Sequence, residues 1–246
     1  MLSSVVYLES ARPNMDYERT ATKWLKWLET IEREITWLAI HRHIFLETQK
    51  IITANTRIQK PSAFYTWMRM AYVTDITVGI RRQLSRDADA ISLWKLLEEL
   101  ATHPQVMSRR RFVALYKGSS VERFADEDFN RFAGKGGLHV DVLLVRKDQK
   151  RLEALWNVVK KYVNRRIAHT DKRDVAYLPT FNDLDRCQDL LEELLKRYVL
   201  LFRASSLVEI LPTFQDDWQA IFREPWIVTE PEEEQKAWLA PPTRTV

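Results

Sequence analysis

The sequence is poor in the residues that build disulfide frameworks, cysteine-rich metal sites and tight turns. Cys187 is the single cysteine among 246 residues, which excludes an intramolecular disulfide and a cysteine-rich zinc site. A lone cysteine also fits a reducing compartment. Glycine occurs five times, and such scarcity favours helices over a turn-rich β fold.

Long uncharged apolar runs are also lacking. No stretch approaches the roughly eighteen apolar residues of a membrane-spanning helix, so no membrane association is expected. The first residues, MLSSVVYLESARPNMDYE, lack the basic start and apolar run of a secretory signal. These absences predict a cytoplasmic protein.

Apolar and aromatic residues are plentiful. The hydrophobic content is 46%, with nine tryptophans, which is enough for one sizeable core and disfavours disorder over most of the length. The formal net charge is +4. Such a modest positive excess permits a nucleic-acid partner without requiring one.

Apolar residues recur at helical spacing over most of the chain, and Pro and Gly fall between these segments. The pattern predicts helices over 16–54, 62–84, 91–100, 139–168 and 180–208. It therefore predicts an all-α fold, an antiparallel helical bundle. The predicted organisation is one domain over 1–222 with an inserted loop and helix region at 105–137. An extended or partly disordered tail is predicted at 223–246.

The first two predicted helices differ in their apolar faces. On the first, Trp24, Trp27 and Trp37 are expected to widen an apolar stripe that consists of Leu28, Ile31, Ile35, Leu38 and Phe45. The second is apolar over much of its circumference and is expected to be central, and Pro61 suits its first turn.

Capping and turn residues mark other boundaries. Asp89 or Ser92 can cap the helix over 91–100, and Thr180 with Asp183 makes a capping-box-like start for the last helix. Cys187 lies on the apolar stripe of that last helix and is expected to be buried packing. The glycine cluster at 134–137 is interpreted as a hinge or tight turn.

The helix predicted over 139–168 changes character at its end. Its apolar stripe consists of Leu152, Leu155, Val159 and Tyr162, and the same spacing continues to Arg166 and His169. One interpretation of Arg166 and His169 is structural, because the macrodipole stabilises each cation near a helix C-terminus by about 0.3–1 kcal/mol. The other is a cationic pocket, in which a guanidinium holds phosphodiester oxygens and an imidazole moves a proton.

Two stretches resemble a known family. NRRIAHTD, at 164–171, resembles the signature helix of HEPN-domain proteins. TDITVGIRRQLSRDADAISLWKLLEEL, at 74–100, is similar to a segment of the abortive-infection-associated, AbiU-like branch of that superfamily. The resemblance implies a helical bundle that is commonly a homodimer. Many members are metal-independent endoribonucleases of toxin–antitoxin or antiviral systems, and others are inactive modules that bind RNA or a partner protein.

The resemblance also implies the site. The family motif is an arginine separated from a histidine by four to six residues. His169 matches the histidine. The nearest candidates for the arginine are Arg165 and Arg166, and three residues lie between Arg165 and His169. The motif implies catalysis by these three residues without a metal or cofactor. RNA is the expected partner, together with an antitoxin or another protein.

Further basic residues are candidates for RNA contacts. At the end of the signature helix these are Lys160, Lys161, Lys172 and Arg173. Arg81 and Arg82 precede the acidic turn that contains Asp87 and Asp89. Two interpretations are open for this arginine pair, an ion-paired helix end or a second wall of the same cationic cleft.

Other polar residues have structural explanations. Asp75, on a largely apolar helix, is predicted to be partly buried and to pair with an arginine or a histidine. His41 and His43 face different directions on one helix, which disfavours a shared metal. The run SRRRFVALYK, at 108–117, is interpreted as solvated surface, with an RNA-contacting arm as the alternative.

Overall fold

The computed structural model describes residues 15–162 and 180–226. The chain divides into two compact units, residues 1–211 and 212–246. The described part of the first unit is helical, and its helices are α1 (Met15–Ala54), α2 (Ala63–Gln83), α3 (Leu93–Thr102), α4 (Arg109–Leu115), α5 (Ala125–Ala133), α6 (Val142–Tyr162) and α7 (Phe181–Arg203). The prediction of an all-α helical bundle is confirmed.

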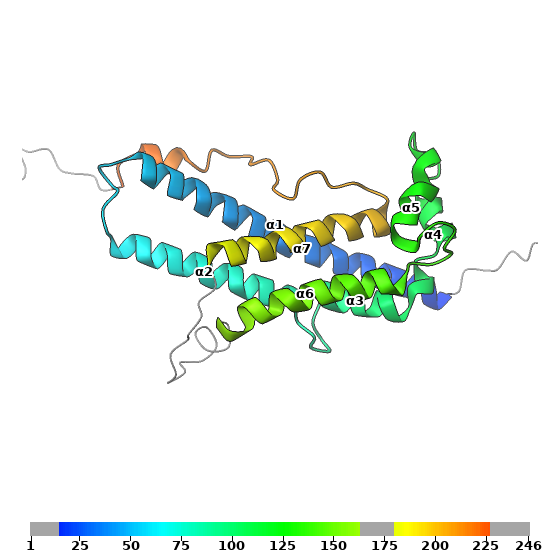
Figure 1. Cartoon of the computed structure of the whole chain (residues 1–246). Helices are drawn as coiled ribbons and strands as arrows, with labels where there is room; N and C mark the ends of the chain where they lie inside the picture. Colours follow the sequence, from blue (N-terminus) through cyan, green and yellow to red (C-terminus); the bar gives the residue numbers. More distant parts are fainter. Residues whose placement is uncertain (1–14, 163–179, 227–246) are drawn as a thin grey trace, which may run out of the picture. The chain divides into compact units, whose positions relative to one another are not determined.

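The long helix α1 is the spine of the first unit. It contacts α2, α3 and α7, while α6 contacts α2, α3 and α7 (Figure 1). One stripe of α1 is buried, and it contains the predicted Trp24, Leu28, Ile31, Ile35, Leu38 and Phe45. Trp37 was expected to widen this apolar face but is 53% exposed, because it lies off the buried stripe.

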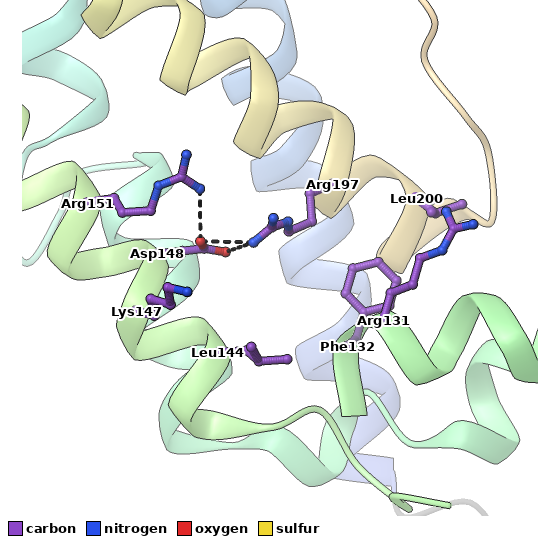
Figure 2. A pocket seen from close by; sticks show the side chains of 8 residues that line it. All are labelled: Arg131, Phe132, Leu144, Lys147, Asp148, Arg151, Arg197 and Leu200. Carbon is purple, nitrogen blue, oxygen red and sulfur yellow. Dashed lines mark hydrogen bonds and ion pairs between the residues drawn. The ribbon is translucent and has the colours of Figure 1, made fainter. Parts of the chain in front are cut away.

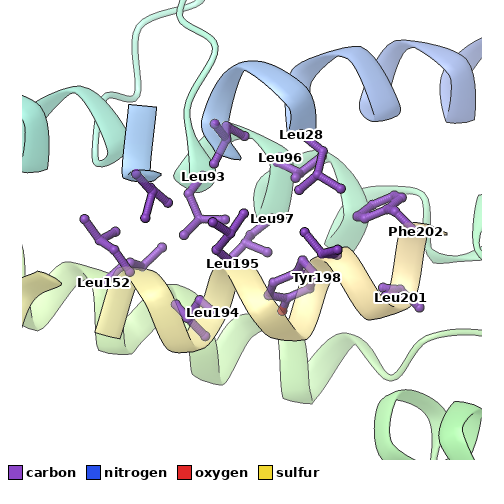
Figure 3. Packing of buried hydrophobic residues seen from close by; sticks show 14 of the residues in the cluster. Leu28, Leu93, Leu96, Leu97, Leu152, Leu194, Leu195, Tyr198, Leu201 and Phe202 are labelled. Carbon is purple, nitrogen blue, oxygen red and sulfur yellow. The ribbon is translucent and has the colours of Figure 1, made fainter. Parts of the chain in front are cut away.

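The core lies between α1, α3, α6 and α7. Figure 3 shows the leucines of α3 and α7 meeting Leu28 of α1 and Leu152 of α6. Burying a side chain of this size contributes about 1.5–3 kcal/mol, so this cluster is the main source of stability. Cys187 is buried in the same stripe of α7, as predicted. Burial raises the pKa of its thiol to about 12, so it stays protonated at neutral pH and is no nucleophile.

Several helix ends follow the predicted capping residues. Ser92 caps α3, since its Oγ accepts from the Lys95 N–H at 3.1 Å. Thr180 and Asp183 form the predicted capping box of α7.

Other boundaries differ from the predictions. The second helix begins after its cap Ser62, so Pro61 precedes the helix instead of lying in its first turn. The sixth helix begins at Val142 because Asp141 caps it, and its Oδ1 accepts from the Leu143 N–H at 2.8 Å. The seventh helix ends at Arg203 and does not reach Val208, because Ala204 is in the left-handed region at φ 52°.

The predicted inserted region folds as two short helices. Phe112 of α4 packs against Phe129 and Phe132 of α5 with ring centroids 5.2 and 6.0 Å apart. Gly134 and Gly136, with φ of 70° and 75°, form the turn after α5, as the glycine cluster predicted.

The second unit is described from 212 to 226. It contains the short 3₁₀ helix η4 (Ala220–Arg223). Aromatic residues four apart contact one another in sequence, and the ring centroids are 6.1–6.2 Å apart for Phe214–Trp218, Trp218–Phe222 and Phe222–Trp226. The predicted tail at 223–246 is described only as far as residue 226, so its extended or partly disordered conformation stays a prediction.

Within 15–162 and 180–226, no helix has both the length and the apolar character that crossing a bilayer requires.

Candidate nucleic-acid interface

Arg81 and Arg82 form the last turn of α2, and both side chains are exposed. Neither makes an ion pair with another residue in the described part of the chain. Asp87 instead accepts from the Ser85 hydroxyl at 2.9 Å. The described residues therefore do not show an ion-paired helix end. Both guanidinium groups remain open to an anion.

A buried amide fixes the helix end that carries this arginine pair. Gln83 is buried, and its Nε2 donates to Glu34 Oε2 of α1 at 2.6 Å. Its Oε1 accepts from the Leu93 N–H at 3.2 Å, which satisfies one of the free donors at the start of α3. The Ser92 hydroxyl donates to the Ser85 carbonyl at 2.8 Å. The arginine pair thus stands on a rigid element.

The apolar stripe of α6 is confirmed as far as the structure describes it. Leu152 and Val159 are buried and Leu155 packs partly buried against the core. Lys160 is exposed, in line with a solvent-facing cation. Lys161 and Tyr162 belong to α6, and the described end of α6 lies beside α2 (Figure 1).

The rest of the predicted site follows α6 in the sequence. It comprises Arg165, Arg166, His169, Lys172 and Arg173, and all five lie outside the described residues. Their proximity to Arg81 and Arg82 therefore stays a prediction.

A histidine–aspartate pair links α1 and α2. The His41 Nδ1 lies 2.6 Å from Asp75 Oδ2, and the Trp37 ring lies beside the imidazole at a centroid distance of 5.5 Å. The prediction that Asp75 pairs with a histidine or an arginine is confirmed. Its predicted partial burial is wrong, since about half of the Asp75 side chain is exposed.

One side of α2 is exposed although most of its residues are apolar. Tyr72, Ile76 and Ile80 face the core, whereas Trp67 and Met70 are 62% and 61% exposed. An open groove of about 870 Å³ lies along this side and is lined by residues including Trp67, Met70, Ala71, Thr74 and Val78. We call these five residues the α2 face. The expectation that α2 is central holds for one side of the helix only.

The basic run at 108–117 is largely structural. Arg109 donates to the carbonyl of Gly137 at 2.9 Å and to Asn130 Oδ1 at 2.7 Å, and so holds the glycine turn against α5. Arg111 pairs with Glu18 of α1 at 2.6 Å. Arg110 alone of the three arginines is exposed. These intramolecular bonds disfavour the RNA-contacting arm.

Within residues 15–162 and 180–226, no group of three or more His, Cys, Asp or Glu side chains is placed to hold a metal ion.

The family model of AbiU2, a HEPN family, matches residues 21–221. The chain belongs to the AbiU2 family of HEPN proteins. The matched range contains both stretches that resemble the family, 74–100 and 164–171. Membership of this family makes the chain a HEPN-like, abortive-infection-associated protein. No curated protein and no solved structure matches the chain.

Proposed function

We propose that this protein acts on RNA as a metal-independent endoribonuclease of a defence or toxin–antitoxin system. The observation that carries the proposal is the exposed arginine pair of α2, which has no acidic partner among the described residues. Guanidinium groups bind phosphate oxygens through paired N–H donors. Membership of a HEPN family supports RNA as the source of these phosphates.

The proposed reaction is cleavage by the 2′-hydroxyl of the RNA. The 2′-oxygen attacks the adjacent phosphorus, and the bond from phosphorus to the 5′-oxygen breaks. His169 moves the proton, either taking it from the 2′-hydroxyl or giving one to the leaving oxygen. Arg165 or Arg166 stabilises the negative charge of the phosphorane-like transition state. The products are a 2′,3′-cyclic phosphate and a free 5′-hydroxyl, and no metal takes part.

The arginine pair gives a direct test of RNA binding. Replacing Arg81 and Arg82 with alanine is expected to weaken retention of single-stranded RNA, because two phosphate contacts are lost. The slope of log affinity against log salt should fall by about 1.4, at about 0.7 for each contact. Fluorescence anisotropy with labelled RNA between 50 and 200 mM salt measures this slope.

The matched control replaces Arg110 and Lys117, two exposed cations, and removes the same charge. If both double variants lost the same RNA affinity, binding would depend on net charge alone. That result would contradict a specific role for the arginine pair.

A catalytically inactive module that binds RNA or a partner protein, or serves as a dimeric scaffold, is the second candidate function. One observation favours it: three residues separate Arg165 from His169, one fewer than the shortest spacing of the family motif. Salt-sensitive RNA binding without cleavage is the result expected of such a module.

We propose that the α2 face is the contact between two copies of the chain. Exposed tryptophan and methionine on one face are typical of the buried centres of interfaces, where a few such residues supply most of the binding energy. The variant Trp67→Asp should weaken the dimer roughly thirtyfold or more, which corresponds to about 2 kcal/mol. Sedimentation equilibrium measures the dissociation constant.

Leu143, which is exposed on α6 away from this groove, provides the matched control Leu143→Asp. A wild-type monomer, or a dimer that tolerates the charge at Trp67, would contradict this interface. An antitoxin or other protein partner stays a prediction of the family resemblance.

A further inference from the structure

The histidine–aspartate contact between α1 and α2 lies at the edge of the α2 face. His41 Nδ1 lies 2.6 Å from Asp75 Oδ2, and 38% of the histidine side chain and 51% of the aspartate side chain are exposed. Asp75 lines the groove of about 870 Å³ together with the residues of the α2 face. A partner that covers this groove therefore also removes water from the Asp75 carboxylate.

The cation of this pair is one that titrates near neutral pH. Figure 2 shows the contrasting case, in which Asp148 of α6 is bound by Arg151 and by Arg197 of α7. Arginine keeps its charge at every physiological pH, so an ion pair of that kind does not respond to pH. Histidine changes its charge between pH 5 and pH 8, so the pair of His41 with Asp75 does respond.

The charged and titratable groups nearest to His41 are paired with one another or stay neutral. On α1, Arg42 binds Asp185 and Asp189 of α7 at 3.0 and 2.6 Å. On α2, Tyr72 is buried, and burial raises the pKa of its hydroxyl, which therefore stays neutral near pH 7.

Two further cations belong to the helices around this pair. His43 is two residues along α1 and acts on Glu47 of the same helix. The helix α6 also contacts α2, and Lys160 in its last turn is exposed. A lysine keeps its charge between pH 5 and pH 8. His41 is therefore the group through which pH acts on Asp75.

The α2 face has the sequence of large and small side chains that suits a contact between two antiparallel copies. Trp67 and Met70 lie before Ala71 along the helix, and the small Thr74 follows it. In an isologous contact, the residue on the two-fold axis meets its own copy. A small residue there lets two helices approach closely, and the antiparallel direction places large side chains against small ones. Ala71 is therefore the residue expected on the axis.

We infer that protonation of His41 controls dimerisation through the α2 face, an inference that rests on the dimer proposed above. With Ala71 on the axis, the partner's Trp67 lies over Asp75, because each of the two is four residues from Ala71. The tryptophan ring removes water from the carboxylate, and a desolvated carboxylate is costly unless a cation is paired with it. Protonated His41 supplies this cation, whereas neutral His41 does not.

The dimer thus holds the proton of His41 more tightly than the monomer does. It is strongest while the imidazole is charged, and it weakens as the pH rises and the proton is lost. The dissociation constant of the dimer should rise about tenfold between pH 6 and pH 8, because two such pairs contribute to each dimer. Sedimentation equilibrium of the full chain at constant ionic strength measures this change.

Two variants separate the roles of the acid and the base. Asp75→Asn leaves no charge to neutralise, so its dimer should be as tight at pH 8 as at pH 6. His41→Gln leaves the carboxylate without a cation, so its dimer should be weak at both pH values. Both side chains are partly exposed, so both variants should keep the wild-type melting curve by circular dichroism. The matched control His43→Gln, on the same helix, should keep the wild-type pH dependence.

The results distinguish control by His41 from the dimer itself. A wild-type dimer with the same dissociation constant at pH 6 and pH 8 would overturn the control and leave the contact through the α2 face intact. A pH dependence that persists in His41→Gln would do the same. A wild-type monomer at both pH values would overturn the contact and its control together.

The variant Ala71→Cys tests the position of the axis. Two copies of residue 71 that meet should form an intermolecular disulfide under mild oxidation. The control Leu143→Cys, exposed on α6 outside the groove, should not form one. Cys187 is buried and does not compete. A dimer that forms no disulfide at residue 71 would overturn the position of Trp67 over Asp75 and with it the reason for the pH dependence.

Discussion

Replacing His169 with alanine is expected to lower the rate of RNA cleavage by about 10²–10⁴-fold, the usual contribution of a positioned general acid or base. Imidazole is the side chain whose unperturbed pKa lies near neutrality, so it exchanges a proton with the 2′-hydroxyl or with the leaving 5′-oxygen. The assay uses a labelled single-stranded RNA and follows product formation in EDTA. Persistent cleavage in EDTA supports the metal-independent mechanism.

Three controls separate this chemistry from contamination or misfolding. His103→Ala removes an exposed histidine at the end of α3 and should leave the cleavage rate unchanged. A substrate with 2′-deoxyribose at the cleaved position should resist cleavage, because the attacking oxygen is missing. Binding of RNA by the His169 variant should persist, since the phosphate contacts remain. RNA that is bound but left intact by the wild type would reject the endoribonuclease and favour the inactive module.

The same assay assigns the arginine. The sequence spacing predicts that Arg166 continues the apolar stripe of Leu152, Leu155 and Val159, and that Arg165, four residues before His169, lies on an adjacent face. Single alanine variants of the two should differ, because only one guanidinium at a time is expected to contact the phosphorane-like transition state. If both variants lowered the cleavage rate equally and only slightly, neither arginine would be the partner of His169 that the family motif requires.

Helical periodicity was sufficient to predict the bundle. The apolar stripes of α1 and α7 could be predicted from spacing, because each helix buries one face and the residues of a buried face are apolar. The capping box at Thr180 was found because its two hydrogen bonds are local. The end of α7 was missed because apolar spacing continues to Val208, which is 81% exposed, while the conformation of Ala204 ends the helix.

Features that depend on distant contacts could not be predicted in the same way. Arg109 donates to the Gly137 carbonyl, 28 residues later, and to the side chains of Asp126 and Asn130 in α5, 17 and 21 residues later. Because these partners are distant in the sequence, the sequence predicted solvated surface for an arginine that has a structural role. The pairing of His41 with Asp75 required knowing which faces of α1 and α2 meet. Asp148 did leave a signal, since it falls on the stripe that continues from Val145 to Leu152, and a charge on a buried stripe needs partners.

Replacing Asp148 with alanine is expected to lower the free energy of unfolding by about 3 kcal/mol. The variant leaves the buried Tyr198 hydroxyl without its acceptor, which costs about 1–3 kcal/mol, and it removes the partner of Arg197. Urea denaturation followed by circular dichroism measures the change as a lower midpoint at an unchanged slope.

Glu193 provides the matched control, because it is also an acid that binds Arg151 and Arg197, yet about half of its side chain is exposed. Glu193→Ala should cost less than about 1 kcal/mol, since water replaces the lost partner. Equal losses in the two variants would mean that burial does not decide the strength of this cluster. Because Asp148 joins α6 to α7, the two helices on either side of residues 163–179, its loss should also lower any RNA cleavage that depends on His169. Glu193→Ala, which leaves the bonds between Asp148 and α7 in place, should keep that activity.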